Sequence, residues 1–111
     1  MVNVNIFTIM VDCQDEQRNN ILNYCPSQLY KNWELISDNH FGGFAKVNSN
    51  LLKFVRQFNL EYKIQLDLVY MGKLFYSLFN LIENDFFPQK TQILVLHTGG
   101  NQGLEGFNFS Y

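Results

Sequence analysis

The sequence has little of what marks several common classes of protein. Its two cysteines, Cys13 and Cys25, form no CxxC pair, so neither a disulfide framework nor a zinc site with ordinary ligand spacing is expected. Its net charge of −2 comes without a basic cluster, which argues against a nucleic-acid partner. No apolar stretch approaches the roughly 20 residues of a membrane-spanning helix, and no basic segment precedes an apolar run at the N-terminus. We therefore expect a cytoplasmic chain with reduced thiols, no metal and no membrane association.

What the sequence does contain is typical of a folded chain. Hydrophobic residues make up 47% of it and aromatic residues 16%, with eleven phenylalanines and six tyrosines, which is too many for a disordered segment. A length of 111 residues leaves room for one small domain or for part of a larger one.

Helical and strand-like patterns alternate along the chain. Strands are expected where apolar residues alternate or run continuously, and helices where they recur at helical spacing, with Asn48 or Ser49 as the N-cap of the second helix. Helices are predicted over 14–24, 50–62 and 73–84, and strands over 2–11, 64–70 and 92–96. This order indicates the α/β class. The last helix and strand are apolar on more faces than a chain of this size easily covers, so the sequence looks like a piece of a larger sheet.

Two segments in the second half of the chain carry the candidate chemistry. One is Val69-Tyr70-Met71-Gly72-Lys73, and the other is the apolar run from Ile93 that breaks into His97-Thr98-Gly99-Gly100. The second reads as a buried strand that delivers polar groups and a flexible backbone to a sheet edge. Ligands of open α/β sheets bind beyond the carboxyl ends of the strands, so both segments are expected to converge on one crevice.

At these segments the chain resembles the pyridoxal-phosphate enzymes that include 1-aminocyclopropane-1-carboxylate deaminase and D-cysteine desulfhydrase. The similar residues are 39–46, 66–73, 86–88 and 93–100, in the order and spacing of the C-terminal third of such enzymes, and the likeness extends over about 30–107. A Tyr-x-Gly-Lys followed some two dozen residues later by His-Thr-Gly-Gly is a fairly specific combination, whereas either half alone is weak.

The resemblance implies the tryptophan-synthase-β-like fold, fold type II. Residues 1–111 would then be the C-terminal part of an open, mostly parallel sheet flanked by helices. The family's Schiff-base lysine and its phosphate loop have no counterpart here, so we expect a C-terminal fragment that is inactive alone. The implied substrate is a small amino acid, the implied cofactor pyridoxal 5'-phosphate, and the implied assembly a homodimer. Two alternatives stay open: a non-catalytic remnant or interaction module that retains the fold's core, and a small α/β binding domain whose motifs match by accident.

The resemblance also implies roles for four residues. Tyr70 matches a family tyrosine beside the cofactor that takes part in substrate activation or proton transfer, and a phenol is able to do both. Thr98 matches a threonine that hydrogen-bonds the pyridine nitrogen in desulfhydrase-like members, while Gly99 and Gly100 would let the backbone pass close to the ring. The alternative interpretation of each is purely structural: a tyrosine at a strand end, a threonine that bonds its own loop, and a simple turn.

Two positions depart from the family pattern. Met71 stands where the deaminases have glutamate and the desulfhydrases commonly threonine, and a thioether is a weak hydrogen-bond acceptor for the ring nitrogen's proton. Phe44 stands where many members have tyrosine, which removes a candidate acid or base. Lys73, in the first turn of a predicted helix, is expected to extend to solvent rather than to carry the cofactor. His97 is expected to be a hydrogen-bonded histidine at a strand end, and the alternative role is to orient the glycine loop that follows it.

Overall fold

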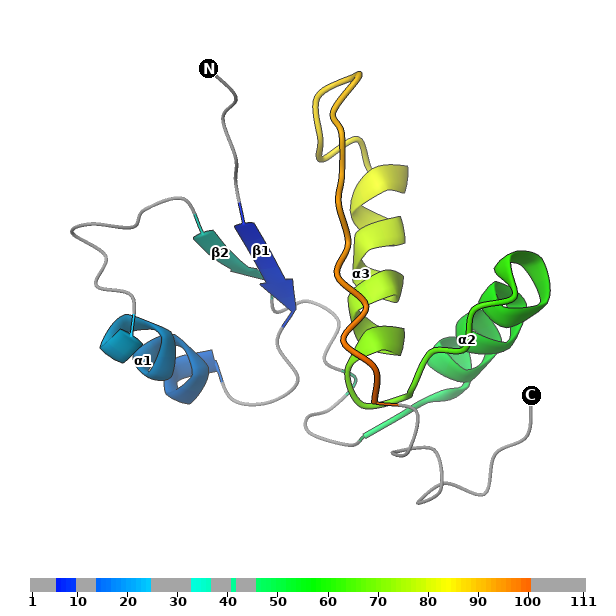
Figure 1. Cartoon of the computed structure of the whole chain (residues 1–111), viewed down its shortest axis with the longest axis horizontal. Helices are drawn as coiled ribbons and strands as arrows, with labels where there is room; N and C mark the ends of the chain where they lie inside the picture. The colour runs from blue at the N-terminus through cyan, green and yellow to red at the C-terminus, as the bar shows by residue number, and fades with distance from the viewer. Residues whose placement is uncertain (1–5, 10–13, 25–32, 37–40, 42–45, 101–111) are drawn as a thin grey trace.

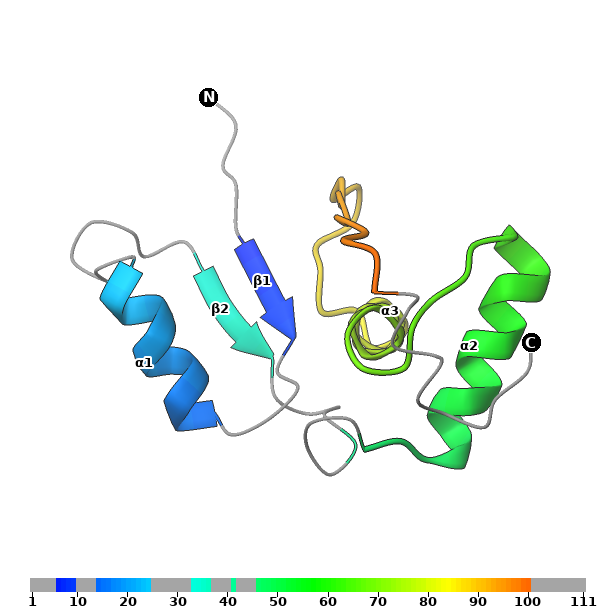
Figure 2. The same ribbon diagram turned by 60° about the horizontal axis from the view of Figure 1, so that its bottom comes forward.

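The computed structural model of the chain describes residues 6–9, 14–24, 33–36, 41 and 46–100. Figure 1 shows a small βαβ unit on one side of α3 and the helix α2 on the other. In both views β1 lies between β2 and α3, and β1 contacts α3 (Figures 1 and 2). In the described part of the chain, no helix combines the length and the apolar character that a membrane span requires.

The βαβ unit consists of two short parallel strands joined through a helix. β1 (Ile6–Ile9) pairs with β2 (Trp33–Ile36), with Ile6 opposite Trp33 and Ile9 opposite Ile36. Parallel strands need a crossover connection, and α1 (Gln14–Tyr24) provides it. The guanidinium of Arg18 in α1 lies 5.8 Å from the ring centroid of Trp33, so α1 and β2 are close. The predicted helix over 14–24 is confirmed, and so is the first predicted strand where it is described.

α2 (Ser49–Tyr62) presents one apolar face to the core. Leu51, Val55 and Phe58 recur at helical spacing and are buried. The Asn48 side chain caps the helix, since its Oδ1 accepts the Leu51 N–H at 3.0 Å. Of the two predicted caps, the structure therefore uses Asn48.

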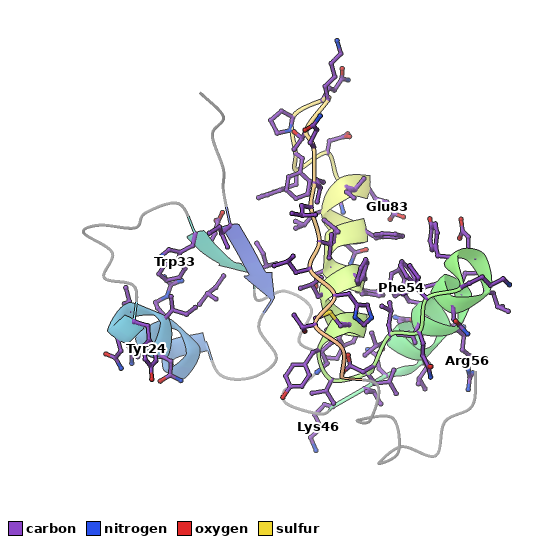
Figure 3. All side chains as sticks on the ribbon, in the orientation of Figure 1. Tyr24, Trp33, Lys46, Phe54, Arg56 and Glu83 are labelled. Carbon is purple, nitrogen blue, oxygen red and sulfur yellow. The ribbon has the colours of Figure 1, made fainter. Side chains whose placement is uncertain are left out.

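α3 (Met71–Glu83) packs against α2 through aromatic rings. Figure 3 shows Phe54 extending from α2 toward α3. Its ring lies 5.4 Å from those of Tyr76 and Phe79, both in edge-to-face geometry, and Phe58 lies 4.9 Å from Phe75. Such edge-to-face pairs contribute about 0.5–1.5 kcal/mol each beyond their buried area. The predicted helix over 73–84 is confirmed, beginning two residues earlier than expected.

The prediction of strands over 64–70 and 92–96 is wrong. Neither segment is hydrogen-bonded into a sheet in the described part of the chain, and the first ends in a turn over 68–70. The burial expected for the second is wrong as well, because Leu94 and Leu96 are 87% and 71% exposed. An apolar extended segment becomes a buried strand only when neighbouring strands cover it, and no described strand lies beside this one.

Candidate functional site

The start of α3 is organised around one buried carboxylate, that of Asp67. Its Oδ2 accepts the N–H groups of Val69 at 2.9 Å and Tyr70 at 2.7 Å, and its Oδ1 accepts that of Met71 at 2.9 Å. The Asp67 main-chain carbonyl accepts the N–H of Gly72 at 2.8 Å. Because the first N–H groups of a helix have no partner within it, the Asp67 carboxylate stabilises the start of α3 by accepting the N–H of Met71, its first residue, while Tyr70 occupies the N-cap position.

Gly72 is required by the close approach of the segments that meet here. A Cβ atom at this position would lie 2.5 Å from the Asp67 carbonyl oxygen and 2.9 Å from Cγ2 of Val55 in α2. Both contacts are shorter than real Cβ contacts, so no larger residue fits without a shift of the backbone. The tight turn from Asp67 into α3 therefore depends on a missing side chain.

Residues 97–100 return to this turn from the far end of α3. In Figures 1 and 2 the chain after α3 runs back along the helix toward its first turn. His97 fixes this end of the segment: its Nε2 lies 3.2 Å from the Gln65 carbonyl oxygen, and its Nδ1 accepts the Gly99 N–H at 3.1 Å. Since Nδ1 accepts, the proton belongs on Nε2, which donates to Gln65. His97 is thus a hydrogen-bonded histidine, as expected, although no strand ends there.

The two glycines that follow differ in their surroundings. Gly99 and Gly100 have φ angles of +91° and +92°, in the region that favours glycine. Among the described residues other than its chain neighbours, a Cβ on Gly99 would meet no atom within 4 Å, whereas a Cβ on Gly100 would lie 3.1 Å from Oδ1 of Asp67. Within the described structure the backbone beside Gly99 is therefore uncovered, and the Gly100 backbone lies close to the Asp67 carboxylate.

The segment Thr98–Gly100 lies against the turn that begins α3. The hydroxyl of Thr98 lies 3.9 Å from Sδ of Met71, the residue that follows Tyr70. The Tyr70 side chain is 47% exposed, and Thr98 is exposed as well. The structure thus brings Thr98 and Gly100 to the turn that carries Tyr70, through contacts with Met71 and Asp67. Their roles in binding or catalysis stay predictions.

Phe44, the second departure from the family pattern, lies outside the described residues.

The prediction that Lys73 extends to solvent is wrong. Its side chain is fully buried in the first turns of α3. Ser77, one helical turn further on, is fully buried too, and its Oγ has no hydrogen-bond partner within the described part of the structure. The expectation followed a general tendency of lysine at helix ends, but the face on which Lys73 lies is the one that turns inward.

Asp67 is the residue of this site to which the sequence pattern assigned no role. In the alternating run 64–70 an aspartate suggests a solvent-facing position, and its burial follows from the turn that replaces the strand. No local sequence signal would have indicated this role, because an N-cap residue stands directly before its helix, whereas Asp67 lies four residues before Met71. Among the described residues, no group of three or more histidine, cysteine, aspartate or glutamate side chains is placed to hold a metal ion.

Part of this chain is similar to part of a known protein. A curated protein of Pyrococcus horikoshii, described as "Putative 1-aminocyclopropane-1-carboxylate deaminase", is 36% identical to this chain over 66 residues. The similarity covers 60% of this chain and 20% of that protein, so the matched part is about a fifth of the relative's length. No family model matches the chain, and no solved structure matches it. The chain is therefore similar to part of a protein described as a deaminase.

Proposed function

We propose that this chain is the C-terminal part of a pyridoxal-phosphate-dependent enzyme of the 1-aminocyclopropane-1-carboxylate deaminase and D-cysteine desulfhydrase family. Its substrate would be a small amino acid. The observation that carries the proposal is the meeting of the two motif segments at the first turn of α3, where Thr98 contacts Met71 and Gly100 packs on Asp67. The similarity to part of the Pyrococcus horikoshii protein supports the same family.

The residues at this turn fit one edge of a flat aromatic cofactor. Tyr70 offers a half-exposed phenol, Thr98 an exposed hydroxyl, and Gly99 a stretch of backbone with open space beside it. Hydroxyl groups suit the polar edge of a pyridine ring, and an open glycine lets the ring approach the main chain. The fit concerns the ring alone, because the family's phosphate loop and Schiff-base lysine have no counterpart in this sequence.

The roles of the chain's own residues follow from their chemistry. Pyridoxal phosphate, when bound, supplies an electron-withdrawing ring that stabilises negative charge on an amino-acid carbon. Thr98 would hydrogen-bond the ring nitrogen with a neutral hydroxyl, which does not force that nitrogen to be protonated. A weaker electron sink suits elimination of a good sulfur leaving group. Tyr70 would hold or move a proton at its phenolic oxygen.

Met71 narrows the reaction class within this proposal. It stands where the family's deaminases have glutamate, and its thioether is only a weak acceptor. In the structure this side chain is 5% exposed and lies against the Thr98 hydroxyl. A desulfhydrase-type reaction is therefore favoured over deamination of an aminocyclopropane. The homodimer and the cytoplasmic location stay predictions.

Titration of the ¹⁵N-labelled chain with pyridoxal 5'-phosphate tests the proposal. We expect the largest amide shifts at residues 70–72 and 98–100, and smaller ones with inorganic phosphate, which lacks the ring. Thr98→Val keeps the shape but removes the hydroxyl, so it should weaken the shifts, while Thr91→Val, at an exposed threonine outside the site, should not. We expect no borohydride-stable adduct on a lysine. Shifts scattered over other elements, or equal effects of the two variants, would refute the ring site.

One observation favours a second function, that of an interaction module without chemistry. Residues 93–96 are extended and apolar, and Leu94 and Leu96 are largely exposed, as in a strand that pairs with a partner. In that case pyridoxal phosphate should leave the amide spectrum unchanged.

A further inference from the structure

We propose that Asp67 is a positioning residue that sets the distance between Tyr70 and the Gly99–Gly100 corner. The proposal rests on the proposed function, because it concerns the two groups that would flank the cofactor ring. It adds a residue to which the resemblance assigns no role.

The Asp67 carboxylate holds the main chain of the turn that carries Tyr70. It is fully buried, and both of its oxygens accept N–H groups of the turn, including that of Tyr70 at 2.7 Å. Hydrogen bonds to an ionised carboxylate are short and directional. The main chain of Tyr70 is therefore held at a fixed place relative to this carboxylate.

The same carboxylate of Asp67 also lies close to the backbone of Gly100. A Cβ on Gly100 would lie 3.1 Å from Oδ1 of Asp67 and 3.2 Å from its Cγ. The Gly100 backbone therefore rests directly on the carboxylate that holds the Tyr70 N–H. Gly99, one residue earlier and at nearly the same φ, has no described atom outside its chain neighbours within 4 Å of its Cβ position.

One side chain thus fixes both halves of the candidate site. The turn 68–72 and the segment 97–100 are far apart in sequence, yet the main chain of the turn hydrogen-bonds to Asp67 and Gly100 lies close to the same carboxylate. A displaced carboxylate would move the phenol-bearing turn and the diglycine corner relative to each other. Displacements of about 1 Å are enough to disturb binding and reactivity at such sites.

The pair Gly99 and Gly100 provides a matched test of the contact. Gly99→Ala and Gly100→Ala carry the same backbone strain, so any difference between them reports the space beside Asp67. We expect Gly100→Ala to lower the Tm by about 5 °C more than Gly99→Ala. In an Asp67→Ser background this difference should become smaller, since serine lacks Oδ1, the atom that lies nearest to a Cβ on residue 100.

A second measurement keeps the contact testable should the Asp67→Ser chain fail to fold. The ¹³Cγ chemical shift of Asp67 should move in Gly100→Ala and stay unchanged in Gly99→Ala. Equal Tm values and equal ¹³Cγ shifts for the two alanine variants would overturn the contact.

A third measurement separates positioning of the site from stability. Asn48→Ala removes the cap of α2, outside the candidate site, and serves as the control for loss of a helix cap. We expect Asp67→Ser to raise the Kd for pyridoxal 5'-phosphate at least tenfold and Asn48→Ala to leave it unchanged. Equal affinities in the two variants would overturn the positioning role. An absence of binding by the unaltered chain would instead overturn the proposed function, and the alanine pair would still decide the contact.

Discussion

Replacing Gly72 with alanine should destabilise the chain, although alanine is the better helix former. The new methyl carbon would lie 2.5 Å from the Asp67 carbonyl oxygen and 2.9 Å from Cγ2 of Val55. Alanine gains about 1 kcal/mol over glycine in helix propensity. Overpacking costs about 1–3 kcal/mol where side chains adjust, and here a main-chain carbonyl has to move, which places the cost at or above the upper end. We expect a net loss of about 2 kcal/mol in the free energy of unfolding.

The loss is measured by urea unfolding in dilute solution, followed by far-ultraviolet circular dichroism. Ser77→Ala, in the same helix, is the control, because it adds no atom. The carbonyl that would be displaced also accepts the Gly72 N–H, so faster hydrogen exchange at this amide should accompany the loss. A Gly72→Ala chain that unfolds at the same or a higher urea concentration than the unaltered chain would refute the close packing of Asp67 and Val55 around this position.

Three further substitutions have definite expected outcomes. Asn48→Ala should lower the free energy of unfolding by about 1 kcal/mol, because the Leu51 N–H loses its acceptor, and Asn48→Asp should preserve it; equal urea midpoints for all three chains would contradict the cap. Ser77→Ala should leave the urea midpoint unchanged or raise it, because no described group accepts or donates to the buried hydroxyl; a loss above about 1 kcal/mol would reveal a partner. Leu94→Lys combined with Leu96→Lys should reduce association between copies of the chain in sedimentation velocity, since both leucines are largely exposed. Unchanged association would show that these leucines do not form the contact between copies.

The helices were predictable because their signals are local. The apolar spacing of Leu51, Val55 and Phe58 and the cap residue Asn48 lie within one segment, and the structure shows both the buried face and the cap. The helix α3 was also predicted, but its start was placed at Lys73. The helix begins two residues earlier, at Met71, whose N–H is accepted by the carboxylate of Asp67 from outside the helix.

The strands failed for the opposite reason. An alternating or continuously apolar run shows that a segment favours an extended backbone, whereas a strand also needs a partner. The pattern over 64–70 and 92–96 carries no information about which strand lies beside it. In the described part of the chain only β1 and β2 pair. The segments predicted as the other two strands are linked instead by the side chain of His97, which follows the second one and hydrogen-bonds the Gln65 carbonyl in the first.

The approach of the two motif segments was predictable, but their packing was not. The order of the motifs predicts that Tyr70 and Thr98 share one crevice, which stays a prediction, and the described contact is that of Thr98 with Met71, the residue after Tyr70. The inward face of Lys73 follows only from how α3 packs, because residue type alone favours the surface. Similarly, the carboxylate of Asp67 acquires its role once the turn gathers three N–H groups on it.

Met71 lies between Asp67 and Thr98 and contacts both. Its main chain is fixed by Asp67, and its side chain is the surface on which the Thr98 hydroxyl rests at 3.9 Å. Sulfur is a weak acceptor, so Thr98 gives up little when it turns toward a stronger one such as a pyridine nitrogen. A glutamate at this position would compete for that nitrogen itself and favour its protonation. Under the proposed function, the thioether would leave Thr98 as the hydrogen-bonding group at the ring edge, an arrangement that suits elimination chemistry.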